Sequence, residues 1–314
     1  MTKNASPTGP GKSDPEFSRS YFLNGSEIVV RRLAAGVYVV ATPIGNLGDI
    51  SLRALETLAG ADLIACEDTR VTAKLLERYG IRASLMPYHE HNAASARPKI
   101  LDRLAGGAAV ALVSDAGTPL ISDPGYKLVQ AAQEAGHPVI AVPGASSVLT
   151  ALAVAGLPTD RFFFEGFLPV KQAARRQRAA ALARIPGTLV IFETGPRLAS
   201  ALADLADILG RRNAAICREL TKLHEEVRRG PLAGLAAHYA GDSETRGEFV
   251  IVIAPPNEEE QAASAADIDN LLRESLAQSS LKDAVASVAA ATGEPRKDIY
   301  RRALQLVKDT GGEG

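Results

Sequence analysis

Three short apolar runs in the first half of this chain each end in a loop rich in glycine and proline. The longest reads Val110-Ala-Leu-Val-Ser-Asp-Ala-Gly-Thr-Pro-Leu-Ile-Ser-Asp-Pro-Gly125. The others are Val37–Ala41 before Thr42-Pro-Ile-Gly-Asn-Leu-Gly-Asp49, and Val139–Val142 before Pro143-Gly-Ala-Ser-Ser147. Such runs are typical of strands buried on both faces of a parallel sheet. Because ligands bind at the carboxyl ends of strands in open α/β sheets, these loops are candidate binding loops. The alternative is ordinary turn chemistry.

Strand-like and helix-like segments alternate along most of the chain, which predicts an α/β protein. We expect a flexible extension at 1–35, α/β domains at 36–157 and 158–256, and a linker with a helical domain at 257–314. The second sheet should be more mixed than the first, and Pro255–Gln261 should be an acidic linker. From Ser280 to Leu304 the pattern reads helix, glycine turn, helix. This shape serves either packing or nucleic-acid binding.

Composition narrows the choice of function. The 314 residues carry a formal net charge of −1, so an RNA contact would need a local basic patch. No apolar run is long enough to span a bilayer, and two distant cysteines suggest a reducing cytoplasm. The glycine fingerprints of Rossmann and P-loop sites are absent. Candidates for a phosphate-binding patch are Arg175, Arg176, Arg178, Arg218, Lys222, His224, Arg228 and Arg229.

Two polar clusters also follow predicted strands. In Cys66-Glu-Asp-Thr-Arg70, Glu67 or Asp68 can orient a substrate or take a proton, or a residue of this cluster can cap the next helix. In His89-Glu-His-Asn92 the remaining ligands of a metal site are missing, so we predict no metal. Two interpretations remain for these histidines: they hydrogen-bond to a polar substrate, or they lie in a simple exposed loop.

Taken together, the motifs resemble the RsmI family of bacterial small-subunit rRNA ribose 2′-O-methyltransferases, which have the tetrapyrrole methylase fold. The resemblance covers about Gly36 to Ile253, and the tail is similar to the family's C-terminal helix-turn-helix. The motifs that carry it are Ala41-Thr-Pro-Ile-Gly-Asn-Leu-Gly-Asp49, Glu67-Asp-Thr-Arg70, His89-Glu-His-Asn92, Ser114-Asp-Ala-Gly-Thr-Pro119, Ser122-Asp-Pro-Gly125, Pro143-Gly-Ala-Ser146 and Arg218-Glu-Leu-Thr-Lys222. One departure is Ile191-Phe-Glu-Thr-Gly-Pro-Arg-Leu198, where Pro196 replaces the usual histidine.

The resemblance implies two α/β domains with a cleft between them that binds S-adenosylmethionine, and a homodimer. It implies as acceptor the 2′-hydroxyl of a cytidine in the decoding region of 16S rRNA, as free RNA or in the 30S subunit. We assign Glu67, His89 and Lys222 as candidate catalytic residues. The candidate donor-binding residues are Ile44, Asp115, Thr118, Ser146 and Ser147 from the first domain, and Phe192, Glu193, Glu219 and Gly247 from the second.

Two alternatives remain open at this point. One is a methylase of the same fold that acts on a tetrapyrrole or another small acceptor. The other is a non-catalytic ribosome-assembly factor with a vestigial pocket. The basic segments and the helical tail favour RNA as the substrate.

Overall fold

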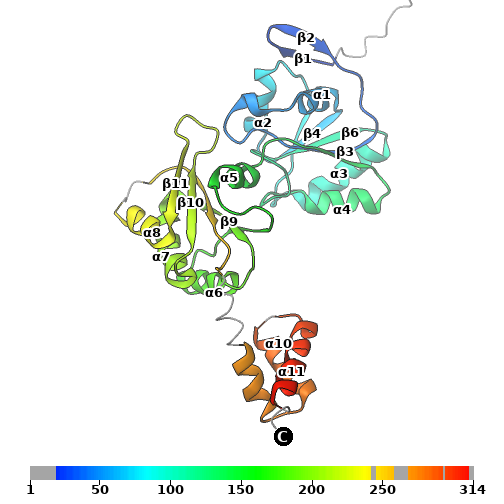
Figure 1. Ribbon diagram of the computed structural model, residues 1–314. Helices are drawn as coiled ribbons and strands as arrows, with labels where there is room; N and C mark the ends of the chain where they lie inside the picture. Colours follow the sequence, from blue (N-terminus) through cyan, green and yellow to red (C-terminus); the bar gives the residue numbers. More distant parts are fainter. Residues whose placement is uncertain (1–18, 242–244, 258–267, 293, 311–314) are drawn as a thin grey trace, which may run out of the picture. The chain divides into compact units, whose positions relative to one another are not determined.

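The computed structural model describes residues 19–241, 245–257, 268–292 and 294–310, which divide into two compact units (Figure 1). The first unit consists of Met1–Val154 together with Arg218–Glu226. The second consists of Ala155–Cys217 and Val227–Gly314. The first division falls close to the expected boundary at 157. In contrast, Arg218–Glu226 was expected in the second domain.

The first unit is built on a five-stranded sheet in which every strand pair is parallel. Its strands are β3 (Gly36–Val40), β4 (Leu63–Cys66), β5 (Leu85–Pro87), β6 (Ala109–Val113) and β7 (Val139–Val142), in the order β5-β4-β6-β3-β7. The predicted parallel sheet is therefore confirmed. Its order places the loops after β3, β6 and β7 on adjacent strands.

Helices cover both faces of this sheet (Figure 1). Alternate strand residues point to opposite faces, so Ile64 and Ala111 pack with one helix layer while Val39 and Leu112 pack with the other. The first layer contains α1 (Leu52–Gly60) and α2 (Thr69–Arg78), and the second contains α3 (Ala93–Ala105) and α4 (Tyr126–Glu134). Burial on both faces explains why these strands read as continuous apolar runs. A further helix, α5 (Ser147–Ala155), follows β7.

A β-hairpin occupies part of the segment in which we expected a flexible extension. Strands β1 (Ser20–Leu23) and β2 (Ser26–Val29) pair antiparallel around Asn24 and Gly25, which both have positive φ. This dipeptide is a strong hairpin signal that the sequence reasoning overlooked. Tyr21 is only 2% exposed and belongs to the core that contains α1 and α2. The prediction was therefore wrong for residues 20–29, whereas residues 1–18 lie outside the described part.

The second unit has a mixed sheet, as expected. Its strands are β8 (Phe162–Phe167), β9 (Thr188–Thr194), β10 (Asn213–Arg218), β11 (Glu226–Pro231) and β12 (Glu248–Ile253), in the order β11-β10-β12-β9-β8. Strand β9 runs parallel to β8 and antiparallel to β12. The helices α6 (Gln172–Leu182), α7 (Gly195–Leu209) and α8 (Leu232–Ala240) share a core with one face of this sheet.

The C-terminal region is helical and has its own small core. Residues 268–276 form a helix, followed by α10 (Leu281–Thr292) and α11 (Arg296–Thr310). Leu272, Val285, Ile299 and Leu306 pack together. The expected glycine turn at Gly293 and most of the expected linker, 258–261, lie outside the described residues. None of the described helices is both long enough and apolar enough to cross a membrane.

Candidate functional site

The loops after β3, β6 and β7 meet at the carboxyl ends of their strands. Thr42 and Gly117 exchange two backbone hydrogen bonds of 2.9 and 3.0 Å. The Thr118 hydroxyl donates to the Ala145 carbonyl oxygen at 3.2 Å. Ile44 is 8% exposed, and its Cγ2 lies 3.3 Å from the position that a methyl group at Gly117 would take. The three loops expected to converge therefore do so.

The loop after β4 is hydrogen-bonded to the loop after β6. The Asp68 N–H donates to Asp115 Oδ1 at 2.9 Å, and the Asp115 N–H donates to the Glu67 carboxylate. The Asp68 side chain caps α2 by accepting from the Arg70 N–H at 2.8 Å. Hydrogen bonds from the Arg70 side chain lower the pKa of Asp68 to about 2. Asp68 is therefore a helix cap, and Glu67 is the carboxylate that remains for chemistry.

Three carboxylates gather where these loops meet. Burial raises the pKa of Glu67, and the neighbouring Asp123 and Asp115 raise it further. Burial also raises the pKa of Asp123, and a hydrogen bond that the Ser114 hydroxyl donates to its carboxylate only partly offsets this rise. Asp123 was not among the sequence candidates, although it stands in the quoted motif Ser122-Asp-Pro-Gly125. The resulting negative potential favours a cationic ligand.

The turn between β10 and β11 belongs to the first unit and brings Glu219 and Lys222 to it. Lys222 Nζ donates to Glu219 Oε1 at 2.9 Å. The Lys222 side chain lies across Gly45, so that a methyl group at Gly45 would be 2.4 Å from Lys222 Cγ. Two sequence candidates from the second half of the chain therefore lie beside the loop after β3.

The other candidates of the first unit occupy the ends of β5 and β7. His89 is half-buried, and its Nδ1 is buried without a hydrogen-bond partner. The Ser146 hydroxyl accepts from the Leu149 N–H at 3.4 Å, and Ser147 is the first residue of α5. In the described part of the chain, no group of three or more His, Cys, Asp or Glu side chains is placed to hold a metal ion.

The candidates of the second unit lie at the end of β9 and just before β12. Glu193 is 1% exposed; it accepts from the Thr194 N–H at 2.8 Å and pairs with Arg197 at 3.2 Å. Burial raises the pKa of Glu193. Phe192 packs edge-on against Phe164, with 4.8 Å between the ring centres. The Gly247 carbonyl accepts from the N–H of Gly195, the residue that follows Thr194, at 3.1 Å.

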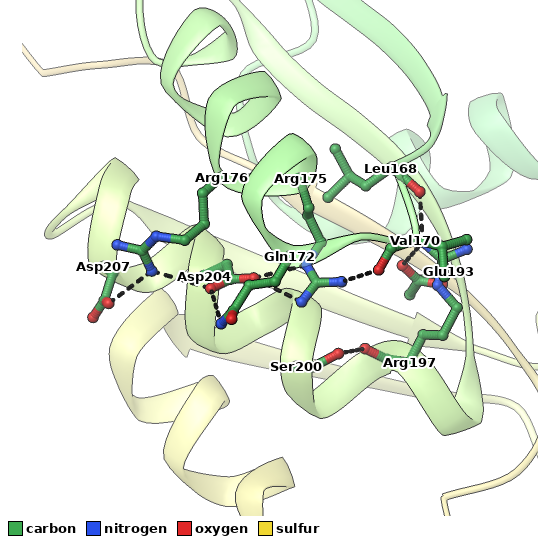
Figure 2. A network of polar contacts seen from close by, with 10 residues as sticks. All are labelled: Leu168, Val170, Gln172, Arg175, Arg176, Glu193, Arg197, Ser200, Asp204 and Asp207. Atoms are coloured by element: carbon green, nitrogen blue, oxygen red, sulfur yellow. Dashed lines mark hydrogen bonds and ion pairs between the residues drawn. The ribbon is translucent and has the colours of Figure 1, made fainter.

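The arginines of α6, which the sequence offered as part of a phosphate-binding patch, are all engaged by carboxylates. Arg175 is 5% exposed and bonds to Asp204 Oδ2 at 2.7 Å, while Arg176 pairs with Asp204 at 3.0 Å and with Asp207 at 3.1 Å (Figure 2). The third, Arg178, makes two 2.6 Å hydrogen bonds to the carboxylate of Glu165 on β8. The prediction is therefore wrong for Arg175, which is buried against Asp204, whereas Arg176 and Arg178 are paired with carboxylates distant in sequence but remain partly exposed.

Comparison with known proteins agrees with this architecture. Residues 36–236 match the family model of Tetrapyrrole (Corrin/Porphyrin) Methylases, and residues 262–307 match the model of the RsmI C-terminal HTH domain. A Mesorhizobium japonicum protein named ribosomal RNA small subunit methyltransferase I is 52% identical, covering 92% of this chain and 98% of its own length. A Pseudomonas aeruginosa protein of the same name is 47% identical, covering 87% and 98%.

Solved structures show the same fold at low sequence identity. A crystal structure of diphthine synthase is 18% identical and has a TM-score of 0.53, covering 72% of this chain and 90% of its own. The methyltransferase CobJ is 19% identical, also with a TM-score of 0.53, covering 70% and 94%. The predicted fold class is therefore confirmed, and the chain belongs to the tetrapyrrole methylase family, within the group whose curated members are named ribosomal RNA small subunit methyltransferase I.

Proposed function

We propose that this protein transfers a methyl group from S-adenosylmethionine to the ribose 2′-hydroxyl of a cytidine in the decoding region of 16S rRNA. The name shared by its relatives supports small-subunit rRNA as the acceptor. The single observation that carries the proposal is the joining of four loops around Glu67, Asp115 and Asp123 at the carboxyl end of the first sheet. We further propose that the enzyme acts in the cytoplasm as a homodimer.

The residues present fit a sulfonium donor. Carboxylates on joined loops offer a cationic ligand a negative potential, and these loops are held by hydrogen bonds before any ligand arrives. Ile44, Asp115, Thr118, Ser146 and Ser147 are the proposed donor contacts of the first unit, with Glu219 beside them. Phe192, Glu193 and Gly247 remain proposed contacts of the second unit, although the Glu193 carboxylate already has internal partners.

When bound, S-adenosylmethionine would supply an activated methyl group: the ribose oxygen would form a bond to the methyl carbon as the carbon–sulfur bond breaks, and S-adenosylhomocysteine would leave with the electron pair of that bond. The protein has to align the acceptor oxygen and remove its proton. Glu67 is our first candidate for the proton acceptor, because its raised pKa makes it a stronger base than an ordinary carboxylate. His89 is the second candidate, and Lys222 is proposed to hold the acceptor.

A donor-binding measurement tests this assignment. Asp115→Ala should abolish S-adenosylmethionine binding in calorimetry while circular dichroism shows an intact fold. The matched control is Asp102→Ala, which removes an exposed carboxylate from α3. Normal donor affinity in Asp115→Ala would refute the assignment of this loop.

The acceptor is tested separately with labelled donor. Mapping of ribose methylation in decoding-region rRNA, with and without the gene, should show one cytidine that loses its methyl group. Incubation with 30S subunits, free 16S rRNA or a precorrin distinguishes an rRNA methylase from a small-molecule methylase. Binding of 30S subunits without any label transfer would instead indicate an assembly factor.

A further inference from the structure

The turn between β10 and β11 holds an unusual backbone conformation at two residues. Glu219 has φ 46° and Thr221 has φ 65°, both in the left-handed region. For a β-branched residue such as threonine this conformation is unfavourable, and it persists only where the surroundings impose it. Two more non-glycine residues with positive φ, Leu120 and Ser122, lie in the loop after β6. Strain is thus concentrated in loops of the proposed site.

The side chain of Thr221 adds a second anomaly. Its Oγ1 is buried and has no hydrogen-bond partner, whereas its backbone N–H donates to Glu225 Oε2 at 2.6 Å. A hydroxyl removed from water without a partner costs free energy, so each such group calls for an explanation. Nothing in the fold of the turn uses this hydroxyl.

The position of the hydroxyl suggests what uses it. Oγ1 of Thr221 lies 3.1 Å from the point that a methyl group at Gly45 would occupy. It therefore faces the loop after β3, next to the Lys222 side chain, whose Cε lies equally near that point. The Lys222 ammonium is already paired with Glu219 at 2.9 Å, so the Thr221 hydroxyl is a hydrogen-bond donor of this turn without an internal partner. Such a donor beside a cationic side chain suits a negatively charged oxygen.

We propose that Thr221 is a substrate-binding residue whose hydroxyl donates a hydrogen bond to a negatively charged oxygen of a bound substrate. That oxygen belongs either to a phosphate of the acceptor RNA or to the carboxylate of the methyl donor. This inference deepens the proposed function and rests on it. The ligand supplies the hydrogen-bond acceptor that the folded chain lacks, and the strained backbone holds the hydroxyl toward the ligand.

Three substitutions in the full-length protein test the proposal. Thr221→Val keeps the β-branched shape and removes only the hydroxyl, Thr221→Ser keeps the hydroxyl, and Thr221→Gly removes both the hydroxyl and the backbone strain. For each variant the Kd of S-adenosylmethionine is measured by calorimetry, KM and kcat are measured on 30S subunits, and Tm is measured without ligand.

We expect Thr221→Val to weaken one of the two ligands about tenfold, the size of one hydrogen bond to a charged group. A raised KM for 30S subunits identifies the RNA phosphate, and a raised Kd for the donor identifies its carboxylate. Thr221→Ser should stay within about twofold of the wild type. Thr221→Gly should bind as poorly as Thr221→Val while its Tm is unchanged or higher, because it loses an unpaired buried hydroxyl and a strained conformation.

Two results would overturn the proposal: ligand constants of Thr221→Val that match the wild type, or activity that falls only in step with Tm across the three variants. Failure of the proposed function looks different, because the wild-type protein would then transfer no label to 30S subunits. In that case the donor Kd would still test the donor carboxylate as the partner of Thr221, and the affinity of the three variants for 30S subunits, measured without transfer, would test the RNA phosphate.

Discussion

Gly45 provides a quantitative test of how the turn between β10 and β11 is seated on the first sheet. In Gly45→Ala the new methyl group would lie 2.4 Å from Lys222 Cγ and 3.1 Å from Thr221 Oγ1. Because the φ of Gly45 is not in the left-handed region, alanine fits the backbone, and any destabilisation must come from this collision. The Lys222 side chain therefore has to leave the loop.

The expected effect on stability is small. Overpacking costs ~1–3 kcal/mol when neighbours cannot move, but a partly exposed lysine side chain can swing away. The loss of its 2.9 Å ion pair with Glu219, which is about a quarter exposed, adds only ~0–1 kcal/mol. We therefore expect Gly45→Ala to lose about 1 kcal/mol in urea unfolding. If Lys222 holds the acceptor, the loss in kcat/KM should reach about tenfold or more, as for one misplaced charged hydrogen bond.

A double-mutant cycle separates this cause from others. Lys222→Ala removes the atoms with which the methyl group collides, so Gly45→Ala should add little to it in kcat/KM. Gly48→Ala is the matched control, because a methyl group there approaches only the Asn46 side chain, at 3.2 Å. An equal loss from Gly45→Ala in both backgrounds would show that Gly45 acts without Lys222 and would refute this reasoning.

Other predictions concern the second unit and acid sensitivity. Asp204→Ala leaves buried Arg175 without its carboxylate and should cost ~3–5 kcal/mol in urea unfolding; a loss below 1 kcal/mol would contradict this. In Gly195→Ala the methyl group would lie 2.1 Å from the Thr245 carbonyl oxygen, so Tm should fall, whereas Gly234→Ala, with open space around it, should not lower Tm. Burial tends to raise the pKa of Asp204, but hydrogen bonds from two arginines outweigh it and lower the pKa. Its contribution is therefore present above pH 3.8 and lost as pH falls through the lowered value, so in a Tm series from pH 7 to 2 the difference in Tm between the wild type and Asp204→Ala should shrink toward the acid end. Burial and two neighbouring aspartates raise the pKa of Glu67, so methyl transfer should rise with pH through that raised value and then level off; Glu67→Gln should lose this rise.

Local patterns along the chain were sufficient to predict the first sheet and its loops. Strands buried on both faces carry apolar residues at every position, and Val37–Ala41 and Val110–Val113 show this directly in the sequence. Ser51 caps α1 by accepting from the Ala54 N–H, and a serine directly before an apolar helical run is a local signal for such a cap. These features depend on neighbours within a few residues, so sequence reasoning can reach them.

Only the tertiary structure decided which charged side chains are paired inside the protein and which remain available to a ligand. Asp204 neutralises Arg175 from 29 residues away, and no local pattern distinguishes that arginine from one that contacts phosphate. Likewise, the turn with Thr221 and Lys222 follows a strand of the second unit but lies against Gly45 of the first. Electrostatic pairing and close packing act between residues that folding brings together, whereas hydrophobic periodicity is a property of the chain itself.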